Sequence, residues 1–593
     1  MADYKAPLNN MQFLLADVFK LPNLWSSMSS LADVDVDTAK AILEEVARLA
    51  QEELAPLNRE ADEEGSHWRD GDVVAPRGFK DAYKLFCDGG WGSLSGNPEF
   101  DGMGMPKTLV AMADECVQGA CMSFGLAPML TAGAALALDT HASTELKSSF
   151  LPKMYSGQWS GAMDLTEPHC GTDLGLIRTR AEPLAGGAYT ITGTKIFITW
   201  GEHDMAENIV HLVLAKLPDA PSGSRGISLF VVPKFLPDEQ GECGERNAVS
   251  CGSIEKKMGI KGSATCVMNF DGAKGWLVGE PHQGLACMFT MMNYERLGVG
   301  VQAIGAAEMS YQNAILYARE RIQGRSADGA KQPQEAADPL LVHADVRRML
   351  LSMRATTEAG RAFYLYVAQW LDIAKFSDDL QRRSHAEKMV SLLTPVAKAF
   401  LTDRALIAAI DGQQIFGGHG YIREWGQEQL VRDIRITQIY EGTNGIQALD
   451  LIGRKTLANN GELLGIFIAD ITAFTASLEP SVLAEMVSQL NTGIAKLEHS
   501  TQKFLQQAAT DKNAVGAAAV DYLAMLGLVG YGYMWLRMAV AATQTSDYGD
   551  AFVAAKLATA KFFFARIFPE LDLLAARVES GSTTLMAMDD DWF

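Results

Sequence analysis

The stretch AYTITGTKIFITW, residues 188–200, decides the fold class. It is rich in Thr, Ile, Tyr and Phe, which favour strands, and glycines precede it. Two more β-rich runs follow, IVHLVLAKL at 209–217 and ISLFVVPKF at 227–235, with Gly, Pro, Asp and Ser turns between them. We therefore predict a β-domain over residues 161–282.

The chain on both sides of this β-domain has the periodicity of helices. In AKAILEEVARLAQEEL, residues 39–54, apolar side chains recur near one face. Helical patterning returns near Leu285, reaches a glycine-rich break at 417–420, and continues in an Ala- and Leu-rich stretch beyond Lys455. We predict a mostly α protein with a central β-domain, in four regions. They are an N-terminal helical domain (1–160), the β-domain (161–282), a helical bundle (283–455) and a C-terminal helical extension (456–593).

The charge balance excludes some partners. With 72 acidic and 51 basic side chains, the formal net charge is −21. Such a charge repels a nucleic-acid backbone unless basic residues gather on one face, and no such cluster is visible in the sequence. We therefore expect no nucleic-acid binding, and an anionic small molecule would need a local basic pocket.

The cysteines and the start of the chain indicate a compartment. The eight cysteines show no CxxC pair and no Cys/His spacing of a zinc site, so we expect a reducing environment and no metal. The opening MADYKAPLNNMQF lacks the basic-then-apolar pattern of a signal peptide, and no run reaches the roughly 18 apolar residues of a membrane span. We expect a cytoplasmic protein. For Tyr522–Leu536 we favour a buried helix over contact with a membrane surface.

The first chemical motif is LTEPHCGTD (165–173), followed by KIFITWGE. Hydroxyls of Thr166, Thr172 and Thr199 can hydrogen-bond a flat redox cofactor or a pyrophosphate, and Phe197 can stack on a ring. Taken alone, Thr in turns and Phe in strands are more often structural.

These two segments resemble the TEPxxGSD-like turn and the K-x-[WF]-I-T strand that members of the acyl-CoA dehydrogenase family carry at a similar separation. The resemblance implies that family's fold, a helical domain, a β-barrel domain and a helical bundle, with FAD as cofactor. Thr172 stands for the usual Ser and keeps the hydroxyl, and the resemblance implies that it lies near the flavin pyrophosphate or the substrate's coenzyme A. The implied flavin contacts are Leu165, Thr166, Gly171, Thr172, Phe197, Ile198 and Thr199.

The second motif, MMNYERLGVGVQAIGAA (291–307), resembles the family's helix with an [DN]-x-x-R pattern. Asn293 and Arg296 are one helical turn apart, so both face one ligand, and the arginine supplies a cation for an acyl-CoA. The family places these residues beside the substrate. The glycines of GVGVQA also match a degenerate dinucleotide fingerprint, but no strand precedes them, which excludes a Rossmann site.

The third motif is the pair YARERIQGR (317–325) and QQIFGGHGYIRE (413–424). In the family, a similar arginine and a Q-x-x-GG turn clamp the flavin diphosphate and adenosine across a subunit interface. Glycine suits a place where backbone approaches a phosphate closely. ERIQGR is one residue shorter than the usual ER-x-x-FG-[RK] and lacks its Phe. The implied clamp residues are Arg321, Gln414, Gly417 and Gly418. The polar stretch SADGAKQPQEAAD (326–338) is expected to be an exposed loop that can move.

The fourth motif, IYEGTNGIQALDLIGRK (439–455), places Glu441 in a loop before a helix that Thr443 or Asn444 can cap. A carboxylate there can simply be a partner of the helix dipole. The match to the family's YEGT implies instead that Glu441 removes the α-proton of an acyl thioester, while its N–H and a flavin ribityl hydroxyl bind the thioester oxygen. The β-hydrogen then leaves as hydride to the flavin. The resemblance also implies Gly442 at the substrate and Thr443 at the cofactor.

A rival base and several alternatives stay open. Some members carry the base on the earlier helix, in an ERL sequence, which makes Glu295 the rival of Glu441. The resemblance implies that a fatty acyl-CoA is oxidised to a trans-2-enoyl-CoA by a homodimer, with electrons passed to an electron-transfer flavoprotein. The long chain is similar to the very-long-chain and 3-methylmercaptopropionyl-CoA dehydrogenases. An acyl-CoA oxidase or an inactive scaffold of this fold are the other possibilities. Helix Glu115–Leu130 lines an acyl-tail pocket or only packs closely, so chain length is not fixed.

Overall fold

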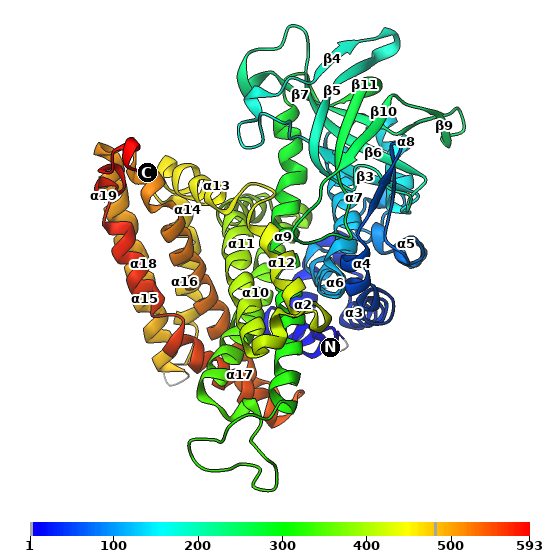
Figure 1. Ribbon diagram of the computed structural model, residues 1–593. Helices are drawn as coiled ribbons and strands as arrows, with labels where there is room; N and C mark the ends of the chain where they lie inside the picture. Colours follow the sequence, from blue (N-terminus) through cyan, green and yellow to red (C-terminus); the bar gives the residue numbers. More distant parts are fainter. Residues whose placement is uncertain (1–3, 480–482) are drawn as a thin grey trace. The chain divides into compact units, whose positions relative to one another are not determined.

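The computed structural model describes residues 4–479 and 483–593, which form two compact units (Figure 1). Unit 2 comprises Glu44–Gly298, and unit 1 comprises the chain up to Leu43 together with Val299–Phe593. The boundary falls inside the long helix α9 (Gly284–Glu320), so its first part belongs to unit 2 and the rest to unit 1.

Unit 2 contains a helical part followed by the strands. Helix α3 (Val36–Leu49) enters it from unit 1. Its own helices are α4 (Ala55–Glu64), α5 (Phe79–Asp88), α6 (Lys107–Ala120), α7 (Met122–His141) and α8 (Thr144–Tyr155). The strands are β1 (His67–Arg69), β2 (Asp72–Val74), β3 (Trp159–Asp164), β4 (Arg180–Pro183), β5 (Ala188–Thr199), β6 (Asn208–Lys216), β7 (Ile227–Pro233), β8 (Phe235–Pro237), β9 (Cys243–Arg246), β10 (Val249–Ile254) and β11 (Thr265–Val278).

The strand pairings close into a small barrel. Strand β11 pairs with β5, β5 with β4, β4 with β6, β6 with β7, and β7 again with β11. Strands β10 and β3 extend the sheet beyond this ring. Strand β7 is buried along its whole length, and β6 along all but its last residue. Their near-continuous apolar runs explain this, because both faces are covered. The pairings confirm the barrel expected at the centre of the chain.

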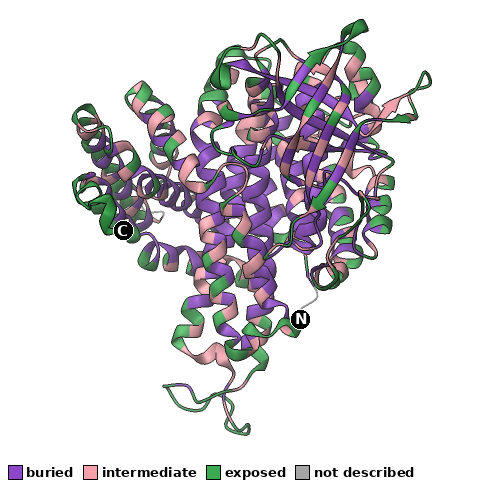
Figure 2. Cartoon of the chain, turned by 45° about the horizontal axis from the view of Figure 1, so that its top comes forward, coloured by how far each residue is buried: buried purple, intermediate pink, exposed green. Residues whose placement is uncertain are grey.

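Unit 1 is helical in its described residues. Some of its long helices are buried along much of their length, whereas others bury only one face and expose the rest (Figure 2). Its helices besides the second part of α9 are α1 (Leu8–Phe13), α2 (Leu21–Trp25), α10 (Ala344–Phe376), α11 (Leu380–Ile415), α12 (Gln427–Arg435), α13 (Asn444–Leu449), α14 (Glu462–Ala476), α15 (Ala484–Thr510), α16 (Ala514–Gln544), α17 (Gly549–Arg566), α18 (Glu570–Glu579) and α19 (Thr583–Met586).

Helix α16 forms part of the core of unit 1. Residues 522–536 are buried, apart from partly exposed Ala524, as expected for a buried helix. Glycines let other helices approach it closely: a Cβ at Gly527 would lie 2.3 Å from the ring of Phe400 on α11, and one at Gly530 would lie 2.5 Å from Phe363 on α10. The small residues of α16 therefore serve close packing.

Two helices, α7 and α16, are long and apolar enough to cross a membrane by length and composition. The expectation concerned uncharged apolar runs, whereas these two helices qualify by windows that admit up to two charged residues, with mean hydropathies of 1.3 and 1.5. Within the protein, 78% and 67% of these windows are buried. Core helices have this character too.

The polar loop 326–338 is organised around one carboxylate. Asp338 is fully buried and accepts hydrogen bonds from the backbone N–H groups of Ser326 (2.9 Å), Lys331 (2.9 Å) and Gln332 (2.7 Å). These bonds, together with that from Arg325, hold the pKa of Asp338 well below its usual range. The loop is mostly exposed, as expected, but it is held in a defined shape.

Gly527→Ala tests the close packing of α16. We expect it to lower the unfolding free energy by roughly 1–3 kcal/mol, because the added methyl group meets the Phe400 ring. Gly516→Ala is the matched control on the same helix, where the added Cβ has open space around it. It should be neutral or gain up to about 1 kcal/mol of helix propensity. Thermal unfolding midpoints measure both, and equal midpoints would contradict the packing argument.

Candidate active site

The turn that follows β3 in unit 2 is pinned by a buried ion pair. Lys195 on β5 is fully buried, and its Nζ donates to Glu167 Oε1 at 2.9 Å and to the Leu165 carbonyl at 3.1 Å. Glu167 also accepts from the N–H groups of Arg178 (2.7 Å) and Thr179 (3.1 Å) and from the Thr179 hydroxyl (2.6 Å). These contacts fix the backbone of the motif LTEPHCGTD on the barrel.

The two members of this ion pair shift each other's pKa. Burial raises the pKa of Glu167, but the Lys195 ammonium and the hydrogen bonds outweigh burial and bring it below its usual value of 4.5. Burial lowers the pKa of Lys195, and Glu167 opposes that change. A buried charge pair with all its hydrogen bonds formed is costly to break from one side, because the remaining charge is left in a medium of low polarity.

A β-bulge turns Phe197 outward. Between the pairs Cys266↔Ile198 and Met268↔Lys195, two residues of β5 oppose one residue of β11. Phe197 has a left-handed backbone (φ 61°) and its side chain is 59% exposed. A left-handed conformation costs a non-glycine residue roughly 1–2 kcal/mol, and bulges commonly re-aim a side chain beside an active site. The strand therefore offers a large aromatic face to a ligand.

The other residues predicted to contact the flavin differ in how exposed they are. Thr166 and Thr199 are partly exposed, and Gly171 and Thr172 are exposed. The Ile198 side chain is only 2% exposed, so that residue has mainly its backbone to offer. An open aromatic ring, two partly exposed threonines and a fixed turn fit a flat, hydrogen-bonding cofactor such as a flavin.

The part of α9 in unit 2 brings two predicted substrate residues together. Arg296 Nη1 donates to Asn293 Oδ1 at 3.1 Å, and the guanidinium lies 5.8 Å from the centre of the Phe289 ring. Arg296 is mostly buried, whereas Asn293 is exposed. The pair is thus one polar group with a fixed cation, as their spacing predicted.

Glu295, the rival base, points toward α7. It is fully buried, and a Cβ placed at Gly133 would lie 2.2 Å from its Oε1 atom. The carboxylate thus packs directly on the backbone of α7. The glycine at position 133 makes this approach possible, since any side chain there would collide with Glu295.

In unit 1, Glu441 lies in a left-handed turn directly before α13. Glu441 (φ 56°) and Gly442 (φ 80°) are both left-handed. The Thr443 hydroxyl accepts from Ile446 N at 3.3 Å and caps the helix, so Thr443 is the cap and Asn444 is not. The buried Gln447 donates through Nε2 to the carbonyls of Glu441 (3.2 Å) and Gly442 (3.3 Å). The Glu441 side chain is partly exposed.

Asn444 anchors the same turn to α11. Its Oδ1 accepts from Lys398 Nζ at 2.8 Å, and its Nδ2 donates to Thr402 Oγ1 (2.9 Å) and Asp403 Oδ1 (2.7 Å). Before the turn, Gln438 Nε2 also donates to Asp403 Oδ1, at 2.6 Å. Tyr440 adds a short hydrogen bond from its hydroxyl to Gln302 on α9. The loop that carries Glu441 is therefore fixed at both ends.

The residues predicted to clamp the flavin diphosphate are exposed. Gln414 and Arg321 are exposed, and a Cβ at Gly417 (φ 58°) or Gly418 would meet nothing within 4 Å. Four aromatic residues support this turn from behind: Tyr317, Phe416, His419 and Trp425. Bare backbone on a rigid support suits close approach by a phosphate group.

Sequence reasoning missed the residues that hold these motifs in place. Lys195 and Glu167 lie inside quoted motifs, but the sequence did not show that they form a buried pair. Gln447 and Lys398 gave no signal, because their role depends on contacts made only in the folded chain.

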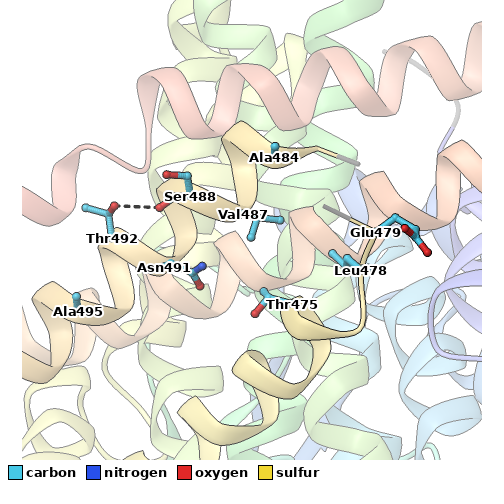
Figure 3. Close-up of a pocket in the computed structure, with 9 residues that line it drawn as sticks. All are labelled: Thr475, Leu478, Glu479, Ala484, Val487, Ser488, Asn491, Thr492 and Ala495. Carbon is cyan, nitrogen blue, oxygen red and sulfur yellow. Dashed lines mark hydrogen bonds between the residues drawn. The ribbon is translucent and has the colours of Figure 1, made fainter. Parts of the chain in front are cut away.

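Two further features have no assigned chemistry. Ligand atoms of Glu167, His169 and Cys170 lie within 4.8 Å of one another, but Glu167 is already paired with Lys195. A cavity of about 520 Å³ opens between the end of α14 and the start of α15 (Figure 3). Among its described lining residues, Glu479 is the charged one, and none belongs to a predicted motif.

Four family models match consecutive parts of the chain. The N-terminal domain of acyl-CoA dehydrogenases matches residues 37–158, the middle domain 162–273, and the C-terminal domain 282–457. The model described as acetyl-CoA dehydrogenase C-terminal like matches 467–589.

Individual relatives match along the whole chain. The 3-methylmercaptopropionyl-CoA dehydrogenase of Ruegeria pomeroyi is 44% identical over 98% of this chain and 99% of its own length. A broad-specificity linear acyl-CoA dehydrogenase of Mycobacterium tuberculosis is 34% identical over 100% of both. The FAD complex of an acyl-CoA dehydrogenase from Bacillus anthracis has a TM-score of 0.75 at 21% identity, covering 96% of this chain and 91% of that one.

The ion pair under the first motif predicts a pH dependence. Because the folded pKa of Glu167 is lowered, its contribution to stability is complete above the ordinary value of 4.5 and is lost as the pH falls through the lowered pKa. Glu167→Gln should cost roughly 3–5 kcal/mol at pH 7 and progressively less in acid. Denaturant unfolding between pH 3 and 7 measures this. Glu182→Gln, an exposed carboxylate on β4, is the control, and a difference that stays constant with pH contradicts the assignment.

Proposed function

The chain belongs to the acyl-CoA dehydrogenase family, and we propose that it oxidises 3-methylmercaptopropionyl-CoA, a short thioether acyl-CoA, to the corresponding 2-enoyl-CoA. It is an oxidoreductase with FAD as its cofactor. The observation that carries the substrate is the 44% identity, along nearly the entire chain, to a protein named for that reaction. The relative named for linear acyl-CoAs is 34% identical.

Glu441 is the proposed base. Removing an α-proton from a thioester needs a carboxylate held at the carbon and a donor for the charge that develops on the thioester oxygen. The left-handed turn at Glu441 and Gly442, whose two carbonyls Gln447 holds, places this side chain and this N–H on one short segment, which suits these two tasks. FAD, when bound, supplies the acceptor that takes the β-hydrogen with its electron pair. The proton then resides on the Glu441 carboxyl until it passes to solvent.

The remaining motif residues hold the two ligands. Phe197 on its bulge and the hydroxyls of Thr166 and Thr199 would hold the flavin ring, and the pinned turn after β3 keeps these groups in place. The Asn293–Arg296 pair would hold the acyl-CoA, since the guanidinium is a fixed cation for an anionic ligand. This pair is a local positive group in a chain of net charge −21.

A homodimer and an electron-transfer flavoprotein complete the proposal. Ile407 (52% exposed) and Ile410 (47% exposed) share a face of α11 with Gln414, and Tyr421 follows with 81% exposure. Apolar side chains beside a phosphate-binding turn favour an interface between two copies, in which each copy helps to clamp the other's flavin. Electrons would pass singly to a flavoprotein partner. The cytoplasmic location stays a prediction.

Glu441→Gln tests the base. We expect the yellow, flavin-bound protein to form normally and its bleaching by substrate to slow by about 10²–10⁴-fold, because the proton acceptor is lost. Stopped-flow absorbance without oxygen measures the reaction. Glu295→Gln is the matched control and should still bleach. Loss of bleaching only in the Glu295 variant would reverse the assignment.

A panel of acyl-CoAs tests the substrate. We expect the thioether acyl-CoA to bleach the flavin with the highest kcat/KM, butyryl-CoA to follow, and chains of twelve carbons or more to react poorly. Best activity with long chains would overturn the substrate proposal while leaving the reaction class intact. Rapid turnover with oxygen alone would identify an oxidase.

A further inference from the structure

We propose that Gln447 is a positioning residue for Glu441, which holds the left-handed turn in the conformation that presents the base. This inference rests on the proposed function, because it concerns the residue that takes the α-proton. Gln447 acts through backbone and is not itself catalytic.

The contact is a two-point clamp on successive carbonyls. Gln447 Nε2 donates to the carbonyl of Glu441 at 3.2 Å and to that of Gly442 at 3.3 Å. These two carbonyls belong to the peptide planes on either side of Gly442. Fixing both planes fixes both backbone angles of Gly442. Because Tyr440 on the other side of Glu441 is held by its own hydrogen bonds to Ile436 and Gln302, the clamp restricts the rotation at Glu441 that sets where its side chain leaves the turn.

The turn needs such support because its backbone is unfavourable. Glu441 carries a side chain at φ 56°, where only glycine is unstrained, and Gly442 at φ 80° is the most flexible residue type. Left alone, this pair would relax to other conformations. A strained backbone persists at a functional site only when its surroundings over-determine it.

The other anchors of the loop act at its ends. Asn444 binds Lys398 and Asp403 on α11 after the turn, and Tyr440 binds Gln302 on α9 before it. They fix where the turn starts and stops. Gln447 reaches the two carbonyls between these ends, so it controls the shape of the turn itself.

In the described part of the chain, the side-chain amide of Gln447 leaves one buried acceptor without a hydrogen bond, which lowers stability. The side chain is fully buried, its Nε2 makes two bonds, and its Oε1 has no hydrogen-bond partner among the described residues. A buried acceptor left without a bond destabilises the fold. What sets Gln447 apart is that its two bonds go to successive carbonyls of the turn that carries Glu441.

Gln447→Met tests the inference, because it keeps the length and apolar bulk and removes the donor. We expect flavin content to be unchanged, the rate of flavin reduction by saturating substrate to fall about 10- to 100-fold, and the substrate concentration for half-maximal rate to change less than about threefold. Hydrogen–deuterium exchange, a readout independent of turnover, should quicken in the segment 440–446.

Gln507→Met is the matched control. Gln507 Nε2 also donates to a backbone carbonyl, that of Glu579 at 2.8 Å, in the C-terminal extension. Gln507→Met removes the same kind of hydrogen bond. It should change neither the rate of flavin reduction nor hydrogen–deuterium exchange in residues 440–446. Gln447→Glu, which keeps the shape and turns an oxygen toward the two carbonyls, is the second variant should the methionine protein fail to fold. It should also be slow.

The outcomes separate this inference from the proposed function. If the parent protein bleaches, Glu441→Gln does not, and Gln447→Met or Gln447→Glu reduces flavin at the parent rate, Gln447 is not a positioning residue. If Glu441→Gln bleaches normally, the proposed base is wrong. Faster exchange in 440–446 with an unchanged reduction rate would also overturn the inference, since the turn's shape would then not matter to the base.

Discussion

Left-handed backbone at a residue with a side chain is the constraint on which the predicted ligand contacts of each unit depend, at Phe197 in unit 2 and at Glu441 in unit 1. At each position the chain takes an unfavourable conformation that turns one side chain outward, an aromatic ring in unit 2 and a carboxylate in unit 1. Each is held by neighbouring contacts: the bulge at Phe197 lies between two pairs of the β5–β11 ladder, and Gln447 binds the carbonyl of Glu441. Strained backbone of this kind persists where the surrounding structure over-determines it.

The sequence predicted the parts of this fold that depend on periodicity and local chemistry. The β-rich runs are strands of the closed barrel, residues 522–536 form part of a buried helix, and Thr443 caps α13. These features depend mainly on residues that are close together in the sequence, so local sequence patterns are enough to predict them. The helical spacing of Asn293 and Arg296 placed them on one face of α9, where the structure shows a hydrogen bond between them; that both face a ligand stays a prediction.

The sequence did not predict features that depend on distant contacts. The bulge at Phe197 requires the register of β5 against β11, which is some 70 residues away in the chain. The ordered shape of loop 326–338 comes from the burial of Asp338, and nothing in its polar composition marks that carboxylate as different from an exposed one. Gln447 is an ordinary helix residue until its two carbonyl partners are known.

The choice between two glutamates follows from what a base must do in every cycle. It takes a proton from carbon and must then release that proton to solvent before the next turnover. Glu441 is partly exposed on a turn whose carbonyls are held by Gln447, so water has access to this residue. Glu295 is fully buried on the face of α9 that packs on Gly133 of α7. A residue sealed from solvent in this way exchanges a proton with water more slowly, which favours Glu441 as the proposed base.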